Sequence, residues 1–395
     1  MILDTNKIRS DTPGCGKDIF LNSAGSSLSP AIVTEKMITY LREEAMTGGY
    51  ELAYQKQEEI QEFYQEVATL IHARPDQVAF TQSATDAYAR ALSAIPFKPN
   101  DCILTSNEDY ISNQIAFLSL QKRFDIRIVR TGSTPDGTID LEDFRRLQIR
   151  RQPVLVAITQ VPTNSGIVQP VEAIGEICRD QDCLYLVDAC QSVGQMNVDV
   201  SKLGCDFLTA TGRKFLRGPR GTGFLYLSDR VIETGLEPLG IDMRGADWIE
   251  KDLYEAQKNA RRFEMWEFPY AALIGLKEAA RYANQTGIRA IEDYNNWLTG
   301  LLRNTLSDIP EVELYDKGVD LCSIVTFRVK GMSLQELQQY LSASGIAFSV
   351  SRREFALLDF SRKGIDGAIR FSPHYFNTKE EVERVAGIVS RIAHS

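Results

Sequence analysis

The chain has 395 residues, of which 44% are hydrophobic and 25% are charged, and its formal net charge is −9. A chain of this length and composition is expected to bury a large core and to divide into a large and a smaller domain. The negative charge argues against nucleic acid or an anionic membrane as the main partner.

The start of the chain, MILDTNKIRS, lacks the basic and apolar regions of a signal peptide, and no apolar run approaches the length of a membrane span. Seven cysteines without a Cys-x-x-Cys pair fit a reducing compartment. We therefore expect a cytoplasmic protein. The three histidines (His72, His374 and His394) are too few for a histidine-rich metal site, and no metal is expected.

Helical patterns alternate with short apolar runs over the first 230 or so residues. The periodicity predicts helices at residues 31–47, 54–72, 85–94, 113–122 and 171–180. The apolar runs predict buried strands at residues 78–81, 103–106, 126–130, 154–160, 184–188 and 223–227, with one more short strand leading to Lys214. This alternation is typical of an α/β fold, a mostly parallel sheet covered by helices.

The pattern changes after a polar, charged stretch at residues 242–258. A long helix is expected at residues 269–286, followed by helices at 291–306, 333–344 and 379–393 and strands near 312–315, 323–329, 347–351 and 368–372. This part reads as a small α+β domain. We predict an N-terminal segment (1–20) that packs with the small domain, a large domain (21–258) and a small domain (259–395) that includes the connecting helix 269–286.

The most informative motif is the run LYLVDACQ at Leu184–Gln191. Asp188 ends a buried strand, and Lys214 follows 26 residues later at the end of the next short strand. An acid and an amine placed this way can hold a pyridine ring between them, which points to pyridoxal phosphate. Gln191 is placed to reach the phenolic oxygen of that ring. Taken singly, Asp188 is equally well a turn-capping aspartate and Lys214 a surface lysine.

A phosphate-binding helix start is expected at the end of the strand at residues 78–81. Ser83, Ala84 and Thr85 lie at a strand-to-helix junction, where free N–H groups and the helix dipole favour a phosphate. Thr211, three residues before Lys214, is a second hydroxyl for the same group. The alternative is an ordinary capped helix start that binds nothing.

These motifs coincide with a known family. The chain resembles the class V aminotransferase superfamily of fold-type I pyridoxal phosphate enzymes, which includes cysteine desulfurases and cysteine or cystine C–S lyases. The resemblance runs from FLNSAG at residues 20–25 to RFSPHYFNT at residues 370–378. Its most specific parts are VDACQSVGQ at residues 187–195 and CDFLTATGRKFLRGPRGTGFL at residues 205–225. The resemblance implies a fold-type I transferase with a mostly parallel seven-stranded sheet and a homodimer with a shared active site.

The resemblance also assigns roles around the cofactor. Lys214 looks like the Schiff-base lysine, Asp188 the partner of the ring nitrogen and Gln191 a contact to the ring oxygen. Either Thr163 or Asn164 matches a further ring-oxygen contact. Ala84, Thr85 and Thr211 match phosphate contacts. Tyr110 stands at or next to the place of the histidine that covers the ring in desulfurases; the alternative is a half-buried tyrosine at a helix start.

The remaining assignments concern the substrate and the partner subunit. Arg370 matches the arginine that grips the substrate carboxylate, or else pairs with a nearby acid as a strand-edge arginine. Arg213 replaces a histidine of many relatives, next to phosphate or substrate, or is structural. The expected substrate contacts also include Asn22, Ser23 and Ala24 of an N-terminal loop and, more weakly, Arg353 beside Arg352. Trp266 and Glu267 are candidates to line the partner's site, or form an aromatic interface plug.

The reaction is restricted by one departure from the desulfurase pattern. Desulfurases need a mobile cysteine shortly before the substrate arginine, and no cysteine lies between Ser344 and Arg370. Cys322 lies further upstream and is expected in the core. The leading hypothesis is an α,β-elimination on a cysteine-derived amino acid, as in C–S lyases. Transamination, epimerisation and γ-elimination with cyclisation of a modified amino acid stay open, and the sequence leaves the substrate side chain unspecified.

Overall fold

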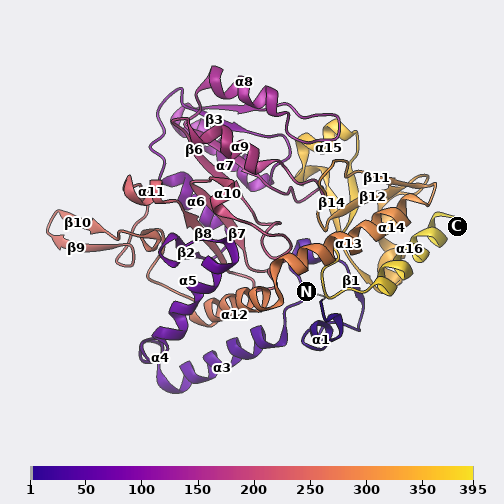
Figure 1. Cartoon of the computed structure of the whole chain (residues 1–395), viewed down its shortest axis with the longest axis horizontal. Coiled ribbons are helices and arrows are strands. Elements are labelled where there is room, and N and C mark those ends of the chain that lie inside the picture. Colours follow the sequence, from indigo (N-terminus) through magenta and orange to yellow (C-terminus); the bar gives the residue numbers. More distant parts are fainter. Residues whose placement is uncertain (1–2, 395) are drawn as a thin grey trace.

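A seven-stranded sheet forms the centre of the larger part of the molecule (Figure 1). The structure is a computed structural model that describes residues 3–394. The strands lie in the order β2-β8-β7-β6-β5-β3-β4; β8 pairs in antiparallel with both β2 and β7, and all other neighbouring pairs are parallel. The predicted mostly parallel sheet is therefore confirmed. Its strands are β2 (Val78–Thr81), β3 (Cys102–Thr105), β4 (Arg127–Arg130), β5 (Leu155–Thr159), β6 (Leu184–Asp188), β7 (Phe207–Thr211) and β8 (Gly223–Leu227).

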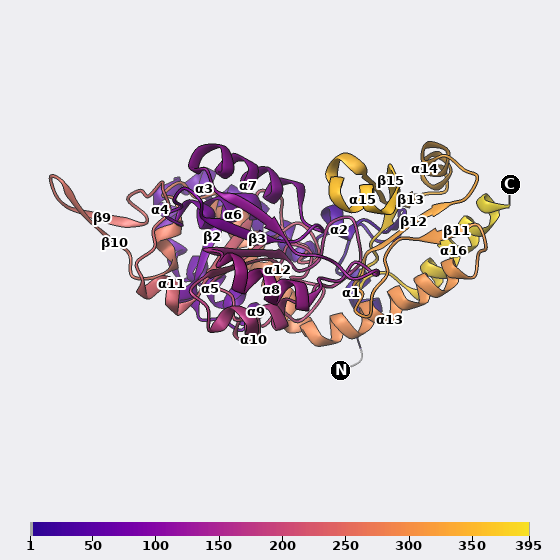
Figure 2. The same ribbon diagram turned by 90° about the horizontal axis from the view of Figure 1, so that it is seen from above.

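Helices cover both faces of this sheet (Figures 1 and 2). On one face, apolar side chains of the sheet pack against α5 (Gln57–Ile71), α9 (Val171–Arg179) and α12 (Tyr270–Thr286). On the other face, they pack against α6 (Ala84–Ser93) and α7 (Ile111–Phe124). Since both faces are buried, β2, β5 and β7 are buried along their whole length, which explains their continuous apolar runs.

A smaller antiparallel sheet, in the order β11-β12-β15-β14, has a hydrophobic cluster of its own. Its strands are β11 (Val312–Leu314), β12 (Val325–Val329), β14 (Ser349–Arg352) and β15 (Gly367–Phe371). The helices α13 (Ile288–Ser307), α14 (Leu334–Ala343) and α16 (Lys379–Ala393) supply buried side chains to this cluster. This arrangement agrees with the predicted α+β unit.

The N-terminal segment reaches the smaller sheet. After α1 (Thr5–Ser10), β1 (Ile19–Phe20) pairs in parallel with β13 (Ile346–Ala347), and α2 (Ser23–Ser26) follows. The long helix α12 packs against α3 (Ala31–Thr47) and α5. The domain boundaries stay predictions; because of these contacts, we propose that α12 belongs with the large sheet.

Several elements differ from the sequence-based expectation. The stretch predicted as one helix at residues 54–72 is α4 (Gly49–Gln55) and α5, and the strand expected at 347–351 is divided between β13 and β14. Unpredicted elements are α1, β1 and α2 near the start of the chain, α8 (Leu141–Arg151), α10 (Val200–Leu203), α11 (Asp229–Glu233), α15 (Leu357–Lys363), three short 3₁₀ turns (Pro75–Gln77, Ala260–Phe263 and Arg353–Phe355) and a hairpin of β9 (Ala246–Glu250) and β10 (Leu253–Ala256).

The hairpin of β9 and β10 projects from the body of the molecule (Figures 1 and 2). Nearly all of its residues are exposed, so its strands show no buried face in the sequence pattern. Within residues 3–394, no helix is long and apolar enough to span a membrane.

Candidate active site

Asp188 ends β6 and lies at the carboxyl edge of the large sheet, where its side chain is 4% exposed. One carboxylate oxygen, Oδ2, accepts a hydrogen bond of 2.9 Å from Asn113 Nδ2, and the other, Oδ1, accepts one of 2.9 Å from the backbone N–H of Cys190. Hydrogen bonds to both oxygens fix the orientation of the carboxylate.

Asn113 belongs to a buried polar network that the sequence did not reveal. Its Nδ2 also donates to Asp109 Oδ1 at 3.0 Å, and Gln114 Nε2 donates to Asp109 Oδ2 at 2.8 Å. Burial raises the pKa of Asp109. The network joins the start of α7 to the end of β6, and the role of Asn113 depends on this tertiary contact and not on a local motif.

Lys214 lies just after β7 and is buried, with 6% of its surface exposed. Its Nζ stands 5.8 Å from the centroid of the Tyr110 ring. Burial lowers the pKa of Lys214; Cys190 and Asp188 oppose this shift, whereas Arg213 and Arg370 add to it. This environment increases the neutral fraction of the amine, as a nucleophile or proton acceptor requires.

Arg370 reaches the same place from β15 of the smaller sheet. Its Nη1 donates a hydrogen bond of 2.9 Å to the backbone carbonyl of Thr163, while its Nε is buried without a partner among the described residues. Gln191 Nε2 donates to Thr163 Oγ1 at 3.2 Å, and Gln191 Oε1 also lacks a partner. Buried polar atoms are nearly always hydrogen-bonded, so these two atoms mark a place where a ligand is expected.

The N-terminal loop closes over these residues. Gln191 Nε2 donates to the carbonyl of Ala24 at 3.3 Å, and Arg213 donates to the carbonyl of Gly25. The backbone N–H of Ala24 donates to Ser372 Oγ at 3.0 Å. Asn22 Oδ1 is buried without a hydrogen-bond partner within residues 3–394, and Ser23 is fully buried. The structure thus brings Asn22, Ser23 and Ala24 to the site.

The start of α6 lies against the start of β8. Gly223 pairs with both Thr81 and Thr211, and a Cβ atom there would come within 2.7 Å of the Ser83 carbonyl carbon. Only glycine permits this close approach. Ser83 Oγ accepts from the backbone N–H of Asp86, as a helix cap does.

That cap leaves the first N–H groups of the helix open. Within the described part of the chain, no acceptor is hydrogen-bonded to the backbone N–H groups of Ala84 and Thr85. Thr211 is positioned beside them through Gly223. These two N–H groups form a place for an anion at the edge of the sheet, whereas the Thr211 hydroxyl beside them donates to the Thr222 carbonyl at 3.2 Å.

Other expected site residues lie apart from this group. Asn164 turns away from Thr163 and donates to Asp359 Oδ2 at 2.6 Å. Arg353 is half-exposed and forms an ion pair of 3.8 Å with Asp366. Trp266 and Glu267 are exposed on the surface of the subunit. Cys322 is buried in a small hydrophobic cluster, which confirms its expected place in the core.

The charges of the site suit a ligand with two anionic groups. In addition to burial, Arg213 lowers the pKa of both Lys214 and Arg370, and Asp188 is the carboxylate that opposes the shift at Lys214. A phosphate and the carboxylate of an amino acid would balance this excess of positive charge. With Asp188 for a ring nitrogen and Tyr110 for a ring face, the residues fit pyridoxal phosphate.

Comparison with known proteins agrees with this chemistry. The family model described as aminotransferase class-V matches residues 19–385. A probable cysteine desulfurase of Methanothermobacter thermautotrophicus is 30% identical, the match covering 100% of this chain and 99% of the relative. A probable cysteine desulfurase of Pyrococcus abyssi is 28% identical over 98% of this chain and 97% of the relative.

Solved structures show the same architecture. A cysteine desulfurase from Thermococcus onnurineus has a TM-score of 0.91 and 26% identity, over 100% of this chain and 99% of that chain. The cystine C–S lyase C-DES, solved with cysteine persulfide, has a TM-score of 0.84 and 20% identity over 97% and 99% of the two chains, a likeness of fold. The chain belongs to the aminotransferase class-V family of pyridoxal phosphate-dependent enzymes.

Proposed function

We propose that the protein is a C–S lyase that carries out an α,β-elimination on a cysteine-derived amino acid. With an S-substituted cysteine and one water molecule, the products are a thiol, pyruvate and ammonia. The observation that carries the proposal is that the buried Lys214 amine lies near enough to Arg370 to feel its charge, while Arg370 Nε has no partner among the described residues. In addition, the segment from residue 345 to residue 369 contains no cysteine.

The residues that would hold the cofactor come from five parts of the chain. Asp188 would pair with the ring nitrogen, Gln191 and Thr163 would contact the ring oxygen, and Tyr110 would cover the ring. The Ala84 and Thr85 N–H groups with Thr211 would hold the phosphate. When bound, pyridoxal phosphate supplies an electron-withdrawing ring that makes the Cα proton of an amino acid acidic. We assign its covalent attachment to Lys214.

Arg370 and Lys214 have different roles toward the substrate. Arg370 binds the α-carboxylate, and its planar guanidinium fixes the rotation of the amino acid about the N–Cα bond. Lys214, whose pKa is lowered by burial, accepts the proton from Cα as a neutral amine. The bond between Cβ and sulfur breaks as electrons move from Cα, and the sulfur leaves as a thiolate.

The cysteines near the site favour release of the sulfur product over its capture by the enzyme. Cys322 is buried in the core. Cys190 is held beside Asp188 by its backbone N–H, and burial raises the pKa of its thiol. A raised pKa reduces the thiolate that would be needed to attack sulfur. Transamination, epimerisation and γ-elimination use the same clamp and proton carrier, and they are the alternatives for the reaction.

The test is a pyruvate assay with the holoenzyme over S-methyl, S-benzyl and S-(2-carboxyethyl) cysteine and cystine. The proposal expects pyruvate, ammonia and thiol in equal amounts, or cysteine persulfide in place of thiol from cystine. Transfer of the amino group to a keto acid, with no release of pyruvate, would show that the protein is an aminotransferase and not a lyase. Persulfide on the enzyme, detected by mass spectrometry, would identify a desulfurase.

We further propose a homodimer with a shared active site. The hairpin of β9 and β10 exposes Trp248 (79% exposed) and Ile249 (52%), and Trp266 is exposed as well. Large apolar side chains that gather on a projecting arm are typical of a protein contact. Sedimentation analysis should give twice the mass of the chain, and Trp248→Asp should shift the protein to the monomer; a wild-type monomer would refute the proposal.

A cytoplasmic location is proposed from the state of the thiols. All seven cysteines lie among the described residues and are free. Free buried thiols are typical of a reducing compartment. Fractionation of cells that express the protein should place it in the cytoplasmic fraction, and recovery from a secreted fraction would refute this.

A further inference from the structure

A cavity of about 340 Å³ lies between α7 and the segment at residues 354–359. Figure 2 shows α7 and α15 on the same side of the molecule. Both walls of this cavity are built from large apolar side chains. These are Ile111, Ile115 and Leu118 of α7, and Phe355, Leu357 and Leu358 of the facing segment. Ile115 (57%) and Phe355 (54%) are among the most exposed of them, so the walls are open to an apolar ligand.

The inner end of this cavity adjoins the candidate active site. Asp109 lines the cavity, and Asn113 donates hydrogen bonds to both Asp109 and Asp188. Asn164 also lines the cavity, and the residue before it, Thr163, contacts Arg370 and Gln191. The lining of the cavity is therefore linked to Asp188 through Asn113 and to Thr163 through the backbone of Asn164.

A polar cluster ties the two walls together. Asn164 donates to Asp359 at 2.6 Å, and Arg362 and Lys363 form ion pairs with Asp359 at 3.0 and 2.8 Å. Arg362 also pairs with the buried Glu108 next to the cavity. These contacts fix α15 against the large sheet. The cavity is therefore a preformed feature and not a gap beside a loose segment.

The chemistry of the lining selects an uncharged, apolar occupant. The one arginine in the lining, Arg130, already donates to Gln114 Oε1 at 3.1 and 2.6 Å, and Gln114 in turn donates to Asp109. An acidic substituent would face the lining carboxylates Asp109, Glu354 and Asp359, which outnumber this arginine. The volume suits a small-molecule group of several carbon atoms and is too small for a folded partner segment.

We propose that this cavity is a specificity pocket for an apolar substituent on the sulfur atom of the substrate, larger than a methyl group. The proposal rests on the function proposed above, because it takes the substrate to be an S-substituted cysteine. The amino acid would be held by Arg370 at the site, and its S-alkyl or S-aryl group would lie between the α7 wall and the Phe355 wall. S-benzyl cysteine would then be preferred to S-methyl cysteine.

The test uses two amino acids without a leaving group, so that it does not depend on elimination. Homophenylalanine and 2-aminobutyrate are titrated into the holoenzyme, and the cofactor absorption band gives each Kd. We expect homophenylalanine to bind at least about tenfold more tightly, since each buried methylene favours binding severalfold. Ile115→Asp should reduce this ratio at least about threefold, because it places a charge in the apolar wall.

Leu239→Asp is the matched control, since Leu239 is exposed and does not line the cavity. It should leave the ratio of the two Kd values unchanged. Equal Kd values of homophenylalanine and 2-aminobutyrate in the wild type would overturn the proposed role of the pocket. A ratio of these values that Ile115→Asp does not lower would also overturn it. An effect of Ile115→Asp on subunit assembly without an effect on the ratio would also overturn it. Absence of pyruvate in the elimination assay would instead overturn the lyase, so the two failures are distinguishable.

Discussion

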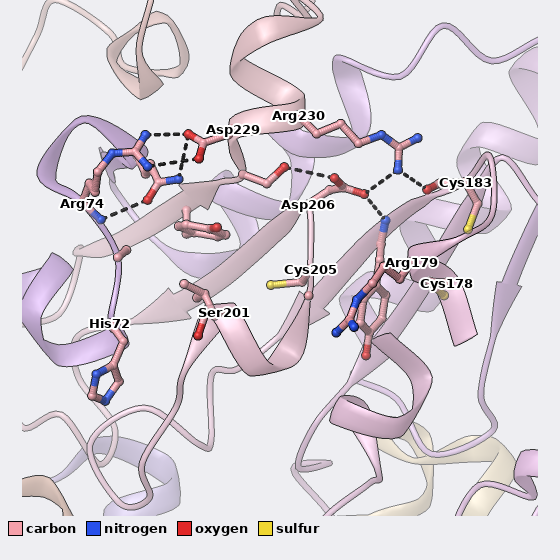
Figure 3. Close-up of a pocket in the computed structure, with 17 residues that line it drawn as sticks. His72, Arg74, Cys178, Arg179, Cys183, Ser201, Cys205, Asp206, Asp229 and Arg230 are labelled. Atoms are coloured by element: carbon pink, nitrogen blue, oxygen red, sulfur yellow. Dashed lines mark hydrogen bonds and ion pairs between the residues drawn. The ribbon is translucent and has the colours of Figure 1, made fainter. Parts of the chain in front are cut away.

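The two edges of the large sheet, where its parallel strands begin and where they end, carry similar polar side chains. They differ in how completely these side chains are hydrogen-bonded. At the end where β6 and β7 begin, a cavity of about 550 Å³ is lined by arginines, carboxylates and cysteines (Figure 3). There Asp206 accepts from the Tyr185 N–H at 2.9 Å and from Ser228 at 3.0 Å, and Arg74 donates to Asp229 at 3.0 Å. Of the described residues in this lining, none has a buried side-chain polar atom without a partner.

At the carboxyl end of the same strands, the polar groups are incompletely paired. Arg370 Nε and Gln191 Oε1 are buried without partners in the described chain, and Lys214 is buried beside two other cations. The cavity of about 550 Å³ therefore belongs to a completed structural network, whereas the unpaired groups mark the site. Partners left open for a ligand are better evidence of function than the size of a cavity.

The largest difference in activity and stability is expected between substitutions of Asp188 and of Asp206. Asp188→Asn should reduce kcat at least about 100-fold with little change in the free energy of unfolding, because it removes the charge that faces the ring nitrogen. Asp206→Asn should leave kcat within about twofold and lower the free energy of unfolding by about 1–3 kcal/mol. Steady-state kinetics and urea unfolding of both variants measure kcat and the free energy of unfolding. Equal losses of activity would abolish the distinction between the two ends.

The two arginines give a second contrast. Arg370→Lys should raise KM for the amino acid about tenfold or more, because a lysine cannot form two parallel hydrogen bonds to a carboxylate. Arg230→Lys, whose partners are the Cys183 carbonyl and Asp206, should leave KM unchanged. Steady-state kinetics with one substrate decide the matter, and an unchanged KM for Arg370→Lys would remove Arg370 from the substrate site.

A smaller effect is expected from the pH dependence of stability. His374 contacts the carbonyl of Phe215 through Nε2 at 2.7 Å, and burial lowers its pKa well below 6.5. The unfolded chain takes up a proton on this ring below about pH 6.5, while the folded chain does not. Stability should therefore fall with decreasing pH by up to about 1.4 kcal/mol per unit.

His374→Gln should remove this contribution, and His72→Gln, at an exposed position in the opposite cavity, should retain it. The measurement is the free energy of unfolding in urea at pH 7.0, 6.0 and 5.5. Parallel curves for wild type and His374→Gln would show that this imidazole does not set the slope.

The sequence predicts the carboxyl-edge site better than the parts around it. Asp188 ends β6, and Lys214 follows the end of the neighbouring strand β7 by three residues. Since the carboxyl ends of parallel strands meet at one edge of a sheet, a local pattern suffices to bring the two side chains together. By contrast, α8 buries only Phe144 and Gln148, and α15 buries only Asp359 and Phe360. The apolar stripe of α8 is short (Leu141, Phe144 and Leu147) and α15 has only seven residues, so the periodic signal of both helices is weak.

Tertiary contacts explain what the motifs leave open. Thr163 and Asn164 are equivalent candidates in the sequence, but they turn to opposite sides, one to Gln191 and the other to Asp359. Arg353 is basic in the expected segment but pairs with Asp366. Such differences arise from the packing of α15 against the large sheet, which no local pattern encodes.

The most direct test of the central claim is reduction of the holoenzyme with borohydride, followed by digestion and peptide mass mapping. The account predicts one pyridoxyl phosphate group per chain, attached to Lys214, and a colourless, unlabelled Lys214→Ala variant. A label on a different lysine, or a wild-type protein that takes up no cofactor, would contradict it.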